Sequence, residues 1–415
     1  MPTPPSTPRG TTRCRGCEQE TLVSVLDLGD QPLSNELVSG PEVRPDVFPL
    51  HLRICTSCGL GQVGEFVLPE RIFGTDYPYL SSTSTSWVAH ARAYAREMTE
   101  GLGLTTGDLV IEIASNDGYL LTGFQESGQQ VLGIEPARNV AALARAAGVP
   151  TVNEFWGEEL AARILAEHGH PRLVVANNVL AHVPDLNDFV AGLARICGPE
   201  TLITVENPSM MTMLVEAQFD TIYHEHFCYL TASSVQHVAA RHGLDLVAVQ
   251  ELPTHGGSNR YHLRRAGTAA PDGSVEALIA RERSEGLFDP ALWSRFEEDS
   301  RRSIDAVSAW LEDRHAAGFT VAGYGAAAKG NTLLNAVGKP AEHLAYVVDG
   351  SEAKQGKFLP GPQTPVLAPE HLSAVPVDDV LILPWNISAE LEPIIRRLCP
   401  QARVWIPRPT VEQLG

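Results

Sequence analysis

The sequence predicts an α/β protein with a small zinc-binding domain at the N-terminus and two Rossmann-like units. Three observations lead to this prediction. Two C-x-x-C pairs lie near the N-terminus, and a strand, polar loop and helix pattern begins at Asp108 and again at Phe319. The length of 415 residues also exceeds that of one ordinary domain. We expect domains over residues 1–75, 76–285 and 286–415.

The composition excludes some classes of partner. A formal net charge of −19 repels a phosphate backbone, so we expect no nucleic-acid partner. No apolar run approaches the roughly 18 residues that a membrane helix needs, so we expect no membrane partner. Residues 1–10 are rich in Pro and Thr and lack an apolar core, which predicts a disordered tail and no signal peptide. A cytoplasmic monomer is therefore expected.

The paired cysteines predict a structural zinc site. Zinc prefers four tetrahedral ligands, and thiolates suit it. An intracellular chain seldom keeps disulfides, although a redox dithiol stays open as an alternative. Gly16 and Gly59 suit tight bends within the two turns. The 37 residues between the pairs predict an inserted hairpin. The four expected ligands are Cys14, Cys17, Cys55 and Cys58.

The central pattern predicts a site for a nucleoside-type cofactor. A strand over Leu109–Ile113 leads into a polar loop, and a second strand over Val131–Ile134 ends in Glu135. An acidic residue at that position can accept hydrogen bonds from both ribose hydroxyls. The loop is not G-x-G-x-x-G, so a dinucleotide is not favoured. Two later strands also end in polar residues. The expected cofactor ligands are Glu112, Ala114, Asn116, Asp117, Gly118, Glu135, Asn177 and Asn178.

The segment Tyr223–His226 concentrates four titratable side chains in consecutive positions. Such crowding is typical of acid–base chemistry, because neighbouring groups tune one another's pKa values. A polar surface loop, or buried histidines bonded to backbone carbonyls, remains an alternative at this point.

The C-terminal pattern predicts a second ligand-binding sheet. Helical spacing of apolar residues runs from Leu292 to Leu311. A strand over Phe319–Ala322 then enters a glycine-containing loop, which Lys329 and a helix from Asn331 follow. Backbone N–H groups and a lysine in such a loop suit an anion.

Three motifs carry a resemblance to a known family. Residues Glu112–Gly118 resemble the first motif of the class I methyltransferases. Tyr223–Leu230 and Tyr324–Thr332 resemble the sugar C-methyltransferases of deoxysugar biosynthesis. That family joins a zinc-binding domain, a class I methyltransferase domain and a C-terminal Rossmann-like domain, and the likeness spans nearly the whole chain. Two positions depart from the family pattern, where Ser is more usual at Cys228 and Gly at Ala114.

The resemblance implies S-adenosylmethionine as methyl donor and a structural Zn²⁺. It also implies a dTDP-linked keto-deoxysugar as substrate, methylated at C-3′. The most similar members act on a 3-amino-4-keto sugar on the way to D-tetronitrose. A ketone beside the reacting carbon allows a base to form an enolate. Methylation of a sugar nitrogen or oxygen, or of a 4-keto-2,6-dideoxysugar without an amino group, stays open.

Proton affinity suggests roles for individual residues, because a neutral histidine is available as a base at pH 7, whereas tyrosine is mostly protonated there. His226 is the expected base and Tyr223 its competitor. Glu225 would hold His226 or bind the sugar's amino group, and His182 would donate to the C-4 oxygen. The resemblance also implies that Tyr77 lies near the sugar, with Tyr79 as its rival. The other expected substrate ligands are Tyr79, His224, Asn207, Tyr324, Lys329, Asn331 and Arg260.

Three other functional classes fit less well. An RNA methyltransferase is disfavoured by the net charge of −19. A nicotinamide-dependent enzyme would need a clear G-x-G-x-x-G. A scaffold protein would not need polar residues at several strand ends.

Overall fold

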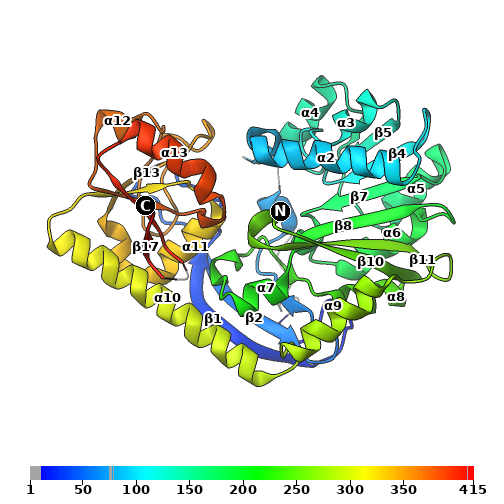
Figure 1. The fold of residues 1–415 in the computed structure, drawn as a ribbon, viewed down its shortest axis with the longest axis horizontal. Helices are drawn as coiled ribbons and strands as arrows, with labels where there is room; N and C mark the ends of the chain where they lie inside the picture. The colour runs from blue at the N-terminus through cyan, green and yellow to red at the C-terminus, as the bar shows by residue number, and fades with distance from the viewer. Residues whose placement is uncertain (1–10, 74–76, 78, 409) are drawn as a thin grey trace. The chain divides into compact units, whose positions relative to one another are not determined.

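The computed structural model describes residues 11–73, 77, 79–408 and 410–415, and the chain forms two compact units (Figure 1). Each unit gathers segments that are far apart in the sequence. Unit 1 comprises Met1–Leu22, Cys55–Ser209 and Phe227–Leu287. Unit 2 comprises Val23–Ile54, Met210–His226 and Phe288–Gly415. The predicted disordered tail, residues 1–10, lies outside the described residues, and the boundaries at 75/76 and 285/286 stay a prediction.

Unit 1 is built around a seven-stranded sheet in the order β10-β11-β8-β7-β4-β5-β6. Strands β4 to β8 run parallel, whereas β11 pairs antiparallel with both β8 and β10. The strands are β4 Leu109–Ile113, β5 Gln130–Ile134, β6 Thr151–Val152, β7 Leu173–Asn177, β8 Leu202–Pro208, β10 Leu244–Leu252 and β11 Ser258–Arg265. A smaller pair, β3 Gly61–Gln62 and β9 Cys228–Tyr229, is antiparallel.

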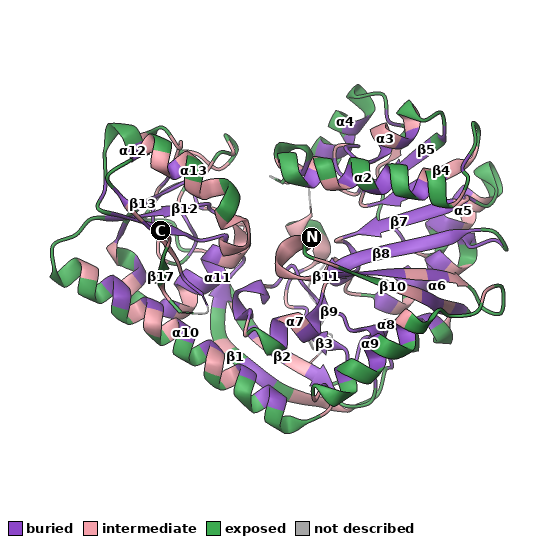
Figure 2. Cartoon of the chain, viewed as in Figure 1, coloured by how far each residue is buried: buried purple, intermediate pink, exposed green. Residues whose placement is uncertain are grey.

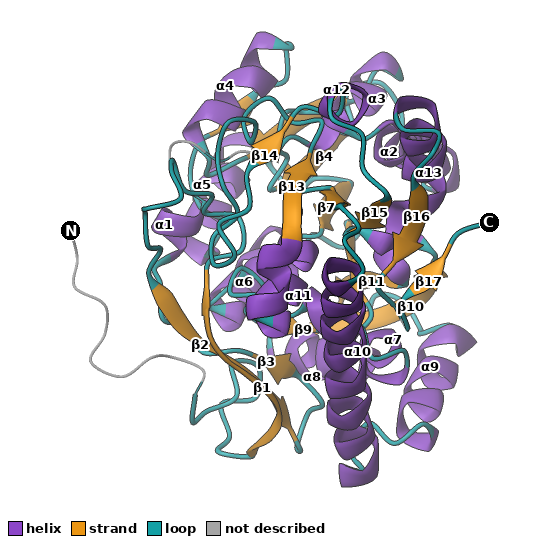
Figure 3. Ribbon diagram, turned by 90° about the vertical axis from the view of Figure 1, so that its left-hand side faces the viewer, coloured by secondary structure: helices purple, strands orange, loops and turns teal. Residues whose placement is uncertain are grey.

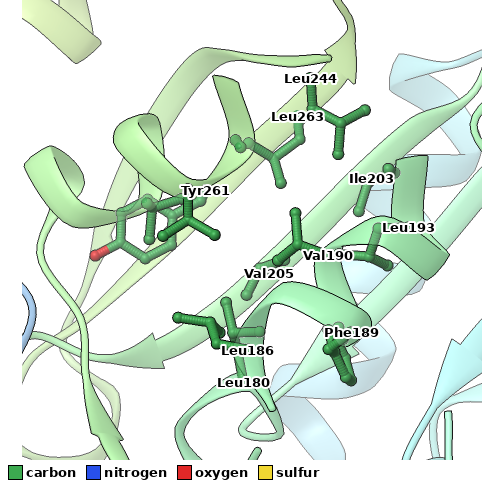
Figure 4. Close-up of a cluster of buried hydrophobic side chains, with 14 of the residues drawn as sticks. Leu180, Leu186, Phe189, Val190, Leu193, Ile203, Val205, Leu244, Tyr261 and Leu263 are labelled. Atoms are coloured by element: carbon green, nitrogen blue, oxygen red, sulfur yellow. The ribbon is translucent and has the colours of Figure 1, made fainter. Parts of the chain in front are cut away.

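Helices cover both faces of this sheet, so its central strands are buried (Figure 2). One face packs on α2 Thr85–Gly101, α3 Leu121–Glu126 and α4 Arg138–Ala146. The other packs on α5 Glu158–His168, α6 Leu186–Ile196, α8 Ala232–Arg241 and α9 Gly273–Ser284. Figure 4 shows part of this second core, where Phe189 and Leu193 of α6 lie with Ile203 and Val205 of β8. Because both faces of the sheet are covered, β7 has consecutive apolar residues from Leu173 to Ala176 instead of alternating apolar and polar ones.

The strand order places a ligand crevice at a known point of the sheet. The chain runs from β4 outward to β5 and β6, and then returns to β7 on the other side of β4. Open α/β sheets bind ligands outside the carboxyl ends of the strands at such a reversal. The loops after β4 and β7 therefore face the expected site.

Unit 2 contains a second, six-stranded sheet in the order β14-β13-β12-β15-β16-β17, parallel except for β17. Here the reversal lies between β12 and β15. The strands are β12 Val321–Tyr324, β13 Leu344–Val348, β14 Val366–Leu367, β15 Asp379–Ile382, β16 Arg403–Ile406 and β17 Glu412–Gln413. Two neighbouring strands, β1 Leu22–Pro32 and β2 Val47–Cys55, precede them in sequence.

The helices of unit 2 are α7 Met210–Val215, α10 Pro290–Ala316, α11 Ala328–Val337, α12 His371–Ala374 and α13 Ser388–Leu398, and unit 1 also has the short α1 Pro69–Ile72. The long α10 is one continuous helix (Figure 3). Asp289 accepts a hydrogen bond from Ala291 N at its start, where Pro290 occupies the first helical position. This confirms the predicted helix between Leu292 and Leu311.

The strands predicted at Leu109–Ile113 and Val131–Ile134 are confirmed as β4 and β5. The strand predicted over Phe319–Ala322 lies two residues later, at Val321–Tyr324, and Phe319 is exposed. The helix after the β4 loop is α3, which begins at Leu121. Within the described residues, no helix combines the length and apolar character that crossing a membrane requires.

Candidate active site and metal centre

The four N-terminal cysteines come together in unit 1. Cys14 Sγ lies 3.5 Å from Cys58 Sγ, Cys17 Sγ lies 3.5 Å from Cys55 Sγ, and all four sulfurs lie within 4.8 Å of one another. Zn–S bonds of about 2.3 Å in a tetrahedron place sulfurs roughly 3.8 Å apart. A disulfide would need about 2.05 Å. The donor set and its spacing therefore fit a structural zinc ion.

The glycines of the two turns have different roles. Gly59 adopts φ of 77°, as a tight bend predicts. Gly16 instead permits close packing, because a Cβ there would lie 2.8 Å from Val238 Cγ2 of α8. Next to it, Arg15 donates to the Pro184 carbonyl at 2.7 Å. We call the two turns Cys14–Cys17 and Cys55–Cys58 the metal module. This module packs against Pro184 and α8, which belong to unit 1 together with the larger sheet.

The loop after β4 is fixed by the carboxylate predicted to bind a ribose. Glu135 Oε2 accepts from Asn116 N at 3.0 Å, and Oε1 accepts from Ala137 N at 2.7 Å. Burial raises the pKa of Glu135 to about 7, although those two backbone bonds act in the opposite direction. Ala114 and Asn116 hold left-handed conformations with φ of 55° and 50°. This conformation explains why the family pattern favours Gly at position 114.

Several buried polar atoms near these strand ends have no hydrogen-bond partner among the described residues. Leaving such an atom unpaired costs about 1–3 kcal/mol, so a cluster of them indicates a site for a polar ligand. Burial also raises the pKa of Glu112 well above its usual range. The amide groups and carboxylates suit the hydroxyl, amino and adenine groups of S-adenosylmethionine. The unpaired atoms belong to Glu112, Ser115, Asp117, Asn177, Asn178 and Asn207.

Tyr79 and Ser81 lie against the same loop. Ser81 N donates to Asn116 Oδ1 at 2.8 Å, and Asn116 Nδ2 donates to the Tyr79 carbonyl at 3.4 Å. The Phe73 ring contacts both Tyr77, at 5.6 Å between centroids, and His182, at 5.5 Å. The structure therefore brings three predicted site residues, Tyr77, Tyr79 and His182, to this part of unit 1.

Arg260 has a partner inside unit 1. Its guanidinium is 1% exposed and donates to Glu206 Oε2 at 2.8 Å, while His90 Nε2 lies 3.0 Å from Glu206 Oε1. Burial acts to raise the pKa of Glu206, but the His90 hydrogen bond and the Arg260 charge outweigh it and lower that pKa. The sequence pattern missed this network, because its members come from three distant segments. Since Arg260 is engaged by a buried carboxylate, we assign it no ligand role.

Within unit 2, Tyr223 and His226 form a hydrogen-bonded pair. His226 Nδ1 lies 3.1 Å from the Thr221 carbonyl, which can only accept a hydrogen bond, so Nδ1 carries the proton. The other nitrogen, Nε2, then has a lone pair and accepts from the Tyr223 hydroxyl at 2.7 Å. The two rings also pack at 4.0 Å between centroids. We call these two residues the Tyr–His pair.

His224 and Glu225, which lie between Tyr223 and His226, are both buried. Each is hydrogen-bonded to a residue of the segment between the two cysteine pairs. Glu225 Oε1 accepts from Asn35 Nδ2 at 2.7 Å. Burial raises the pKa of Glu225 to about 7, against opposing effects of Asn35 and the charge of Lys354. His224 donates from Nε2 to the Phe48 carbonyl at 3.1 Å, and burial lowers its pKa, so its ring is neutral near pH 7.

The Tyr–His pair belongs to the carboxyl edge of the second sheet. Thr332 of α11 donates to the Ile222 carbonyl at 3.1 Å, one residue before Tyr223. Asn331, beside it, has a buried amide with neither polar atom paired among the described residues. The predicted anion residue Lys329 lies in the same helix start, with its ammonium 5.0 Å from the Trp385 ring. These contacts place four predicted substrate or catalytic residues at one edge.

The second sheet also carries an acidic residue that the sequence analysis overlooked. Asp349, just after β13, accepts from Ala326 N at 2.7 Å in the loop after β12. Glu135 makes the equivalent contact in unit 1. Lys354 pairs with Asp349 at 3.5 Å. The rule that identified Glu135, an acidic residue at the end of the second strand, would also have identified Asp349.

Replacing Glu135 with Gln should change how stability depends on pH. Between pH of about 4.5 and 7, folded Glu135 keeps a proton that the unfolded chain has released, so stability falls as pH rises. We expect this fall, on the order of 2–3 kcal/mol, to be smaller in Glu135→Gln. Thermal unfolding of cofactor-free protein at several pH values would measure it. Glu225, whose pKa is also raised, affects the wild type and Glu135→Gln equally. If stability fell with pH by the same amount in both proteins, the raised pKa would not belong to Glu135.

Replacing Ala114 with Gly should stabilise the chain. A left-handed conformation costs a residue with a Cβ about 1–2 kcal/mol, while Gly adds freedom to the unfolded chain worth about 0.4–1 kcal/mol. We therefore expect a net gain of about 0.5–1 kcal/mol, measured by thermal unfolding. The matched control Ala142→Gly, at an exposed position inside α4, should lose stability by about 0.5–1 kcal/mol, because glycine is less favourable than alanine in a helix interior.

Comparisons with known proteins divide the chain into a zinc-binding part and two further parts. Three family models match the chain: a zinc binding domain over residues 14–73, a methyltransferase domain over 87–249, and a C-methyltransferase C-terminal domain over 253–404. The C-methyltransferase NovU of Streptomyces niveus is 34% identical over 389 residues, which cover 92% of each chain.

Solved structures are similar over part of the chain. Magnesium protoporphyrin IX methyltransferase from Synechocystis PCC 6803, with bound SAH, gives a TM-score of 0.34 at 15% identity, covering 43% of this chain and 83% of that one. The PH0226 protein from Pyrococcus horikoshii OT3 gives 0.35 at 11% identity, covering 47% and 97%.

The family models match nearly all of the described chain, and the relative is similar over almost its whole length. The class I methyltransferase sheet, the four-cysteine cluster and the second Rossmann-like sheet are the parts that these matches predict. The chain belongs to the S-adenosylmethionine-dependent sugar C-methyltransferase family, whose members combine a zinc-binding domain, a class I methyltransferase domain and a C-terminal Rossmann-like domain.

Proposed function

We propose that this enzyme methylates C-3′ of a dTDP-linked 4-keto deoxysugar, with dTDP-3-amino-2,3,6-trideoxy-4-keto-glucose as its substrate. The observation that carries the proposal is the Tyr–His pair, in which the Tyr223 hydroxyl donates to His226 Nε2 at 2.7 Å. Carbon is a poor nucleophile until a proton has been removed, so a C-methyltransferase needs a base. A ketone beside C-3 makes that proton acidic enough to remove.

The hydrogen bonds of the pair favour one order of proton movements. Because His226 Nε2 already accepts from Tyr223, the Tyr223 oxygen takes the C-3 proton while its own proton passes to Nε2. The Thr221 carbonyl keeps the other ring proton on Nδ1 and so orients the acceptor. General base catalysis of this kind contributes about 10²–10⁴-fold.

Other predicted residues complete the reaction. His182 donates a hydrogen bond to the C-4 oxygen as negative charge develops there, with Tyr77 nearby. Bound S-adenosylmethionine supplies an electrophilic methyl group, held by the residues of the β4, β5 and β7 loops. C-3 loses one proton to the Tyr–His pair and gains one methyl group, and the C-4 ketone re-forms.

Residues of unit 2 suit the nucleotide-sugar. The backbone N–H groups at the start of α11 and the ammonium of Lys329 favour a pyrophosphate. The unpaired amide of Asn331 offers polar contacts. Tyr324, another expected substrate ligand, is instead 6% exposed and packs in the hydrophobic core of the second sheet. Buried Glu225 lies beside the Tyr–His pair in sequence, where a carboxylate can accept hydrogen bonds from the sugar's amino group.

An exchange experiment tests the proposal. The enzyme is incubated in deuterated water with the dTDP-linked sugar and S-adenosylhomocysteine, and C-3 deuterium is followed by NMR. Exchange at C-3, and a new C-3 methyl signal when S-adenosylmethionine is supplied, are expected. Methyl transfer to the 3-amino nitrogen or a hydroxyl, without C-3 exchange, would contradict it. The same sugar without its amino group tests that part of the substrate assignment.

A further inference from the structure

A buried cluster in unit 2 joins the Tyr–His segment to the second sheet. Asp220 is 0% exposed, and its Oδ2 accepts from Trp385 Nε1 at 2.6 Å. Its Oδ1 lies 3.4 Å from Arg408 Nη1. Arg408, 5% exposed, also donates from Nη2 to the Glu216 carbonyl at 2.6 Å and lies 4.5 Å from the Trp385 ring.

The location of this cluster connects it with the site. Trp385 lies three residues after the end of β15 and Arg408 two residues after the end of β16, so both come from the carboxyl ends of strands at the edge where ligands bind. Asp220 immediately precedes Thr221, whose carbonyl accepts from His226 Nδ1 at 3.1 Å. Fixing Asp220 therefore fixes the carbonyl that sets which His226 nitrogen faces Tyr223.

We propose that Asp220, Trp385 and Arg408 are positioning residues for proton removal by the Tyr–His pair. They hold the Thr221 carbonyl in place and thereby keep His226 Nε2 as the acceptor for Tyr223. This inference rests on the proposed function of the pair. It assigns a task to three residues outside the pair, which come from three separate segments of the chain.

The same unit contains a matched cluster at the opposite end of the sheet. Asp379, also 0% exposed, accepts from Trp405 Nε1 at 2.7 Å and from Arg403 Nη2 at 2.7 Å. Asp379 is the first residue of β15, so this cluster lies at the amino end of that strand. The chain thus offers an Asp–Arg–Trp cluster with the same chemistry but without a connection to Thr221.

The test compares Trp385→Phe with Trp405→Phe in the full-length enzyme. Each removes one indole–carboxylate hydrogen bond, so similar losses of thermal stability are expected. Only Trp385→Phe should lower kcat and C-3 exchange, by about 10- to 100-fold, because small displacements of catalytic groups have effects of this size. Its affinity for S-adenosylmethionine, measured by calorimetry, should stay within about twofold of wild type.

Arg408→Lys serves as a second variant if Trp385→Phe fails to fold, since Lys keeps the charge but cannot reach two acceptors at once. Equal kcat losses in Trp385→Phe and Trp405→Phe, or wild-type kcat in the folded Asp220-cluster variant, would overturn the positioning role. Absence of C-3 exchange in the wild-type enzyme would instead overturn the proposed function, so the two failures are distinguishable.

Discussion

Tyr223→Phe and His226→Asn are each expected to lose C-3 exchange and methyl transfer, with kcat falling by about 10²–10⁴-fold. Phe keeps the ring that packs at 4.0 Å on His226 but removes the hydroxyl, and Asn removes the Nε2 acceptor. Because the two groups act as one relay, the double variant should be little worse than either single variant. Exchange rates by NMR and single-turnover methyl transfer measure both effects.

Tyr346→Phe is the matched control, since the Tyr346 hydroxyl donates to the Val375 carbonyl at 2.5 Å elsewhere in unit 2. It should retain wild-type exchange. Full exchange in His226→Asn together with its loss in Tyr223→Phe would show that Tyr223 works without a histidine acceptor. The reverse result would restore His226 as the sole base, and additive losses would contradict the relay.

Removal of zinc is expected to unfold the metal module. Structural zinc contributes about 10–16 kcal/mol in small zinc domains, which equals or exceeds the roughly 5–15 kcal/mol stability of a whole protein. Cys55→Ser should therefore lose zinc and lower the thermal midpoint. Because Arg15 and Gly16 pack against Pro184 and α8 of the same unit, affinity for S-adenosylmethionine should fall as well.

Cys197→Ser is the matched control, because Cys197 is also buried in unit 1 but stands outside the cluster. It should retain one zinc per chain, measured by elemental analysis, and a near wild-type midpoint. Full helicity and methyl transfer in the metal-free wild-type enzyme would show that the cysteines do not hold a structural ion.

Local patterns were sufficient to predict much of the chain. The run at Leu109–Ile113 is a buried strand, as an apolar run followed by a polar turn predicts. The strand predicted at Phe319–Ala322 is also present, but two residues later, at Val321–Tyr324. Paired C-x-x-C spacing predicted the zinc ligands, because four thiolates suit one metal. The position of Glu135 beside the β4 loop was predictable, because it follows β5, which pairs in parallel with β4; its role as a ribose ligand stays a prediction.

Relations between distant segments were not predictable in this way. Arg260 was expected to bind the substrate, yet it is 1% exposed and bonded to Glu206, because β11 pairs antiparallel with β8 and places the two side by side. Nothing near Asp220 in the sequence indicates Trp385 or Arg408, which follow it by more than 150 residues.

The sequence by itself determined the class of chemistry, since cysteine spacing, strand ends and the residues of the Tyr223–His226 segment are local properties. Only the tertiary structure decided which nitrogen of His226 carries the proton and which residues hold it there. The physical reason is that a hydrogen-bond partner is chosen by position in space, and folding brings Thr332, Trp385 and Arg408 to residues 216–222 from the other end of the chain.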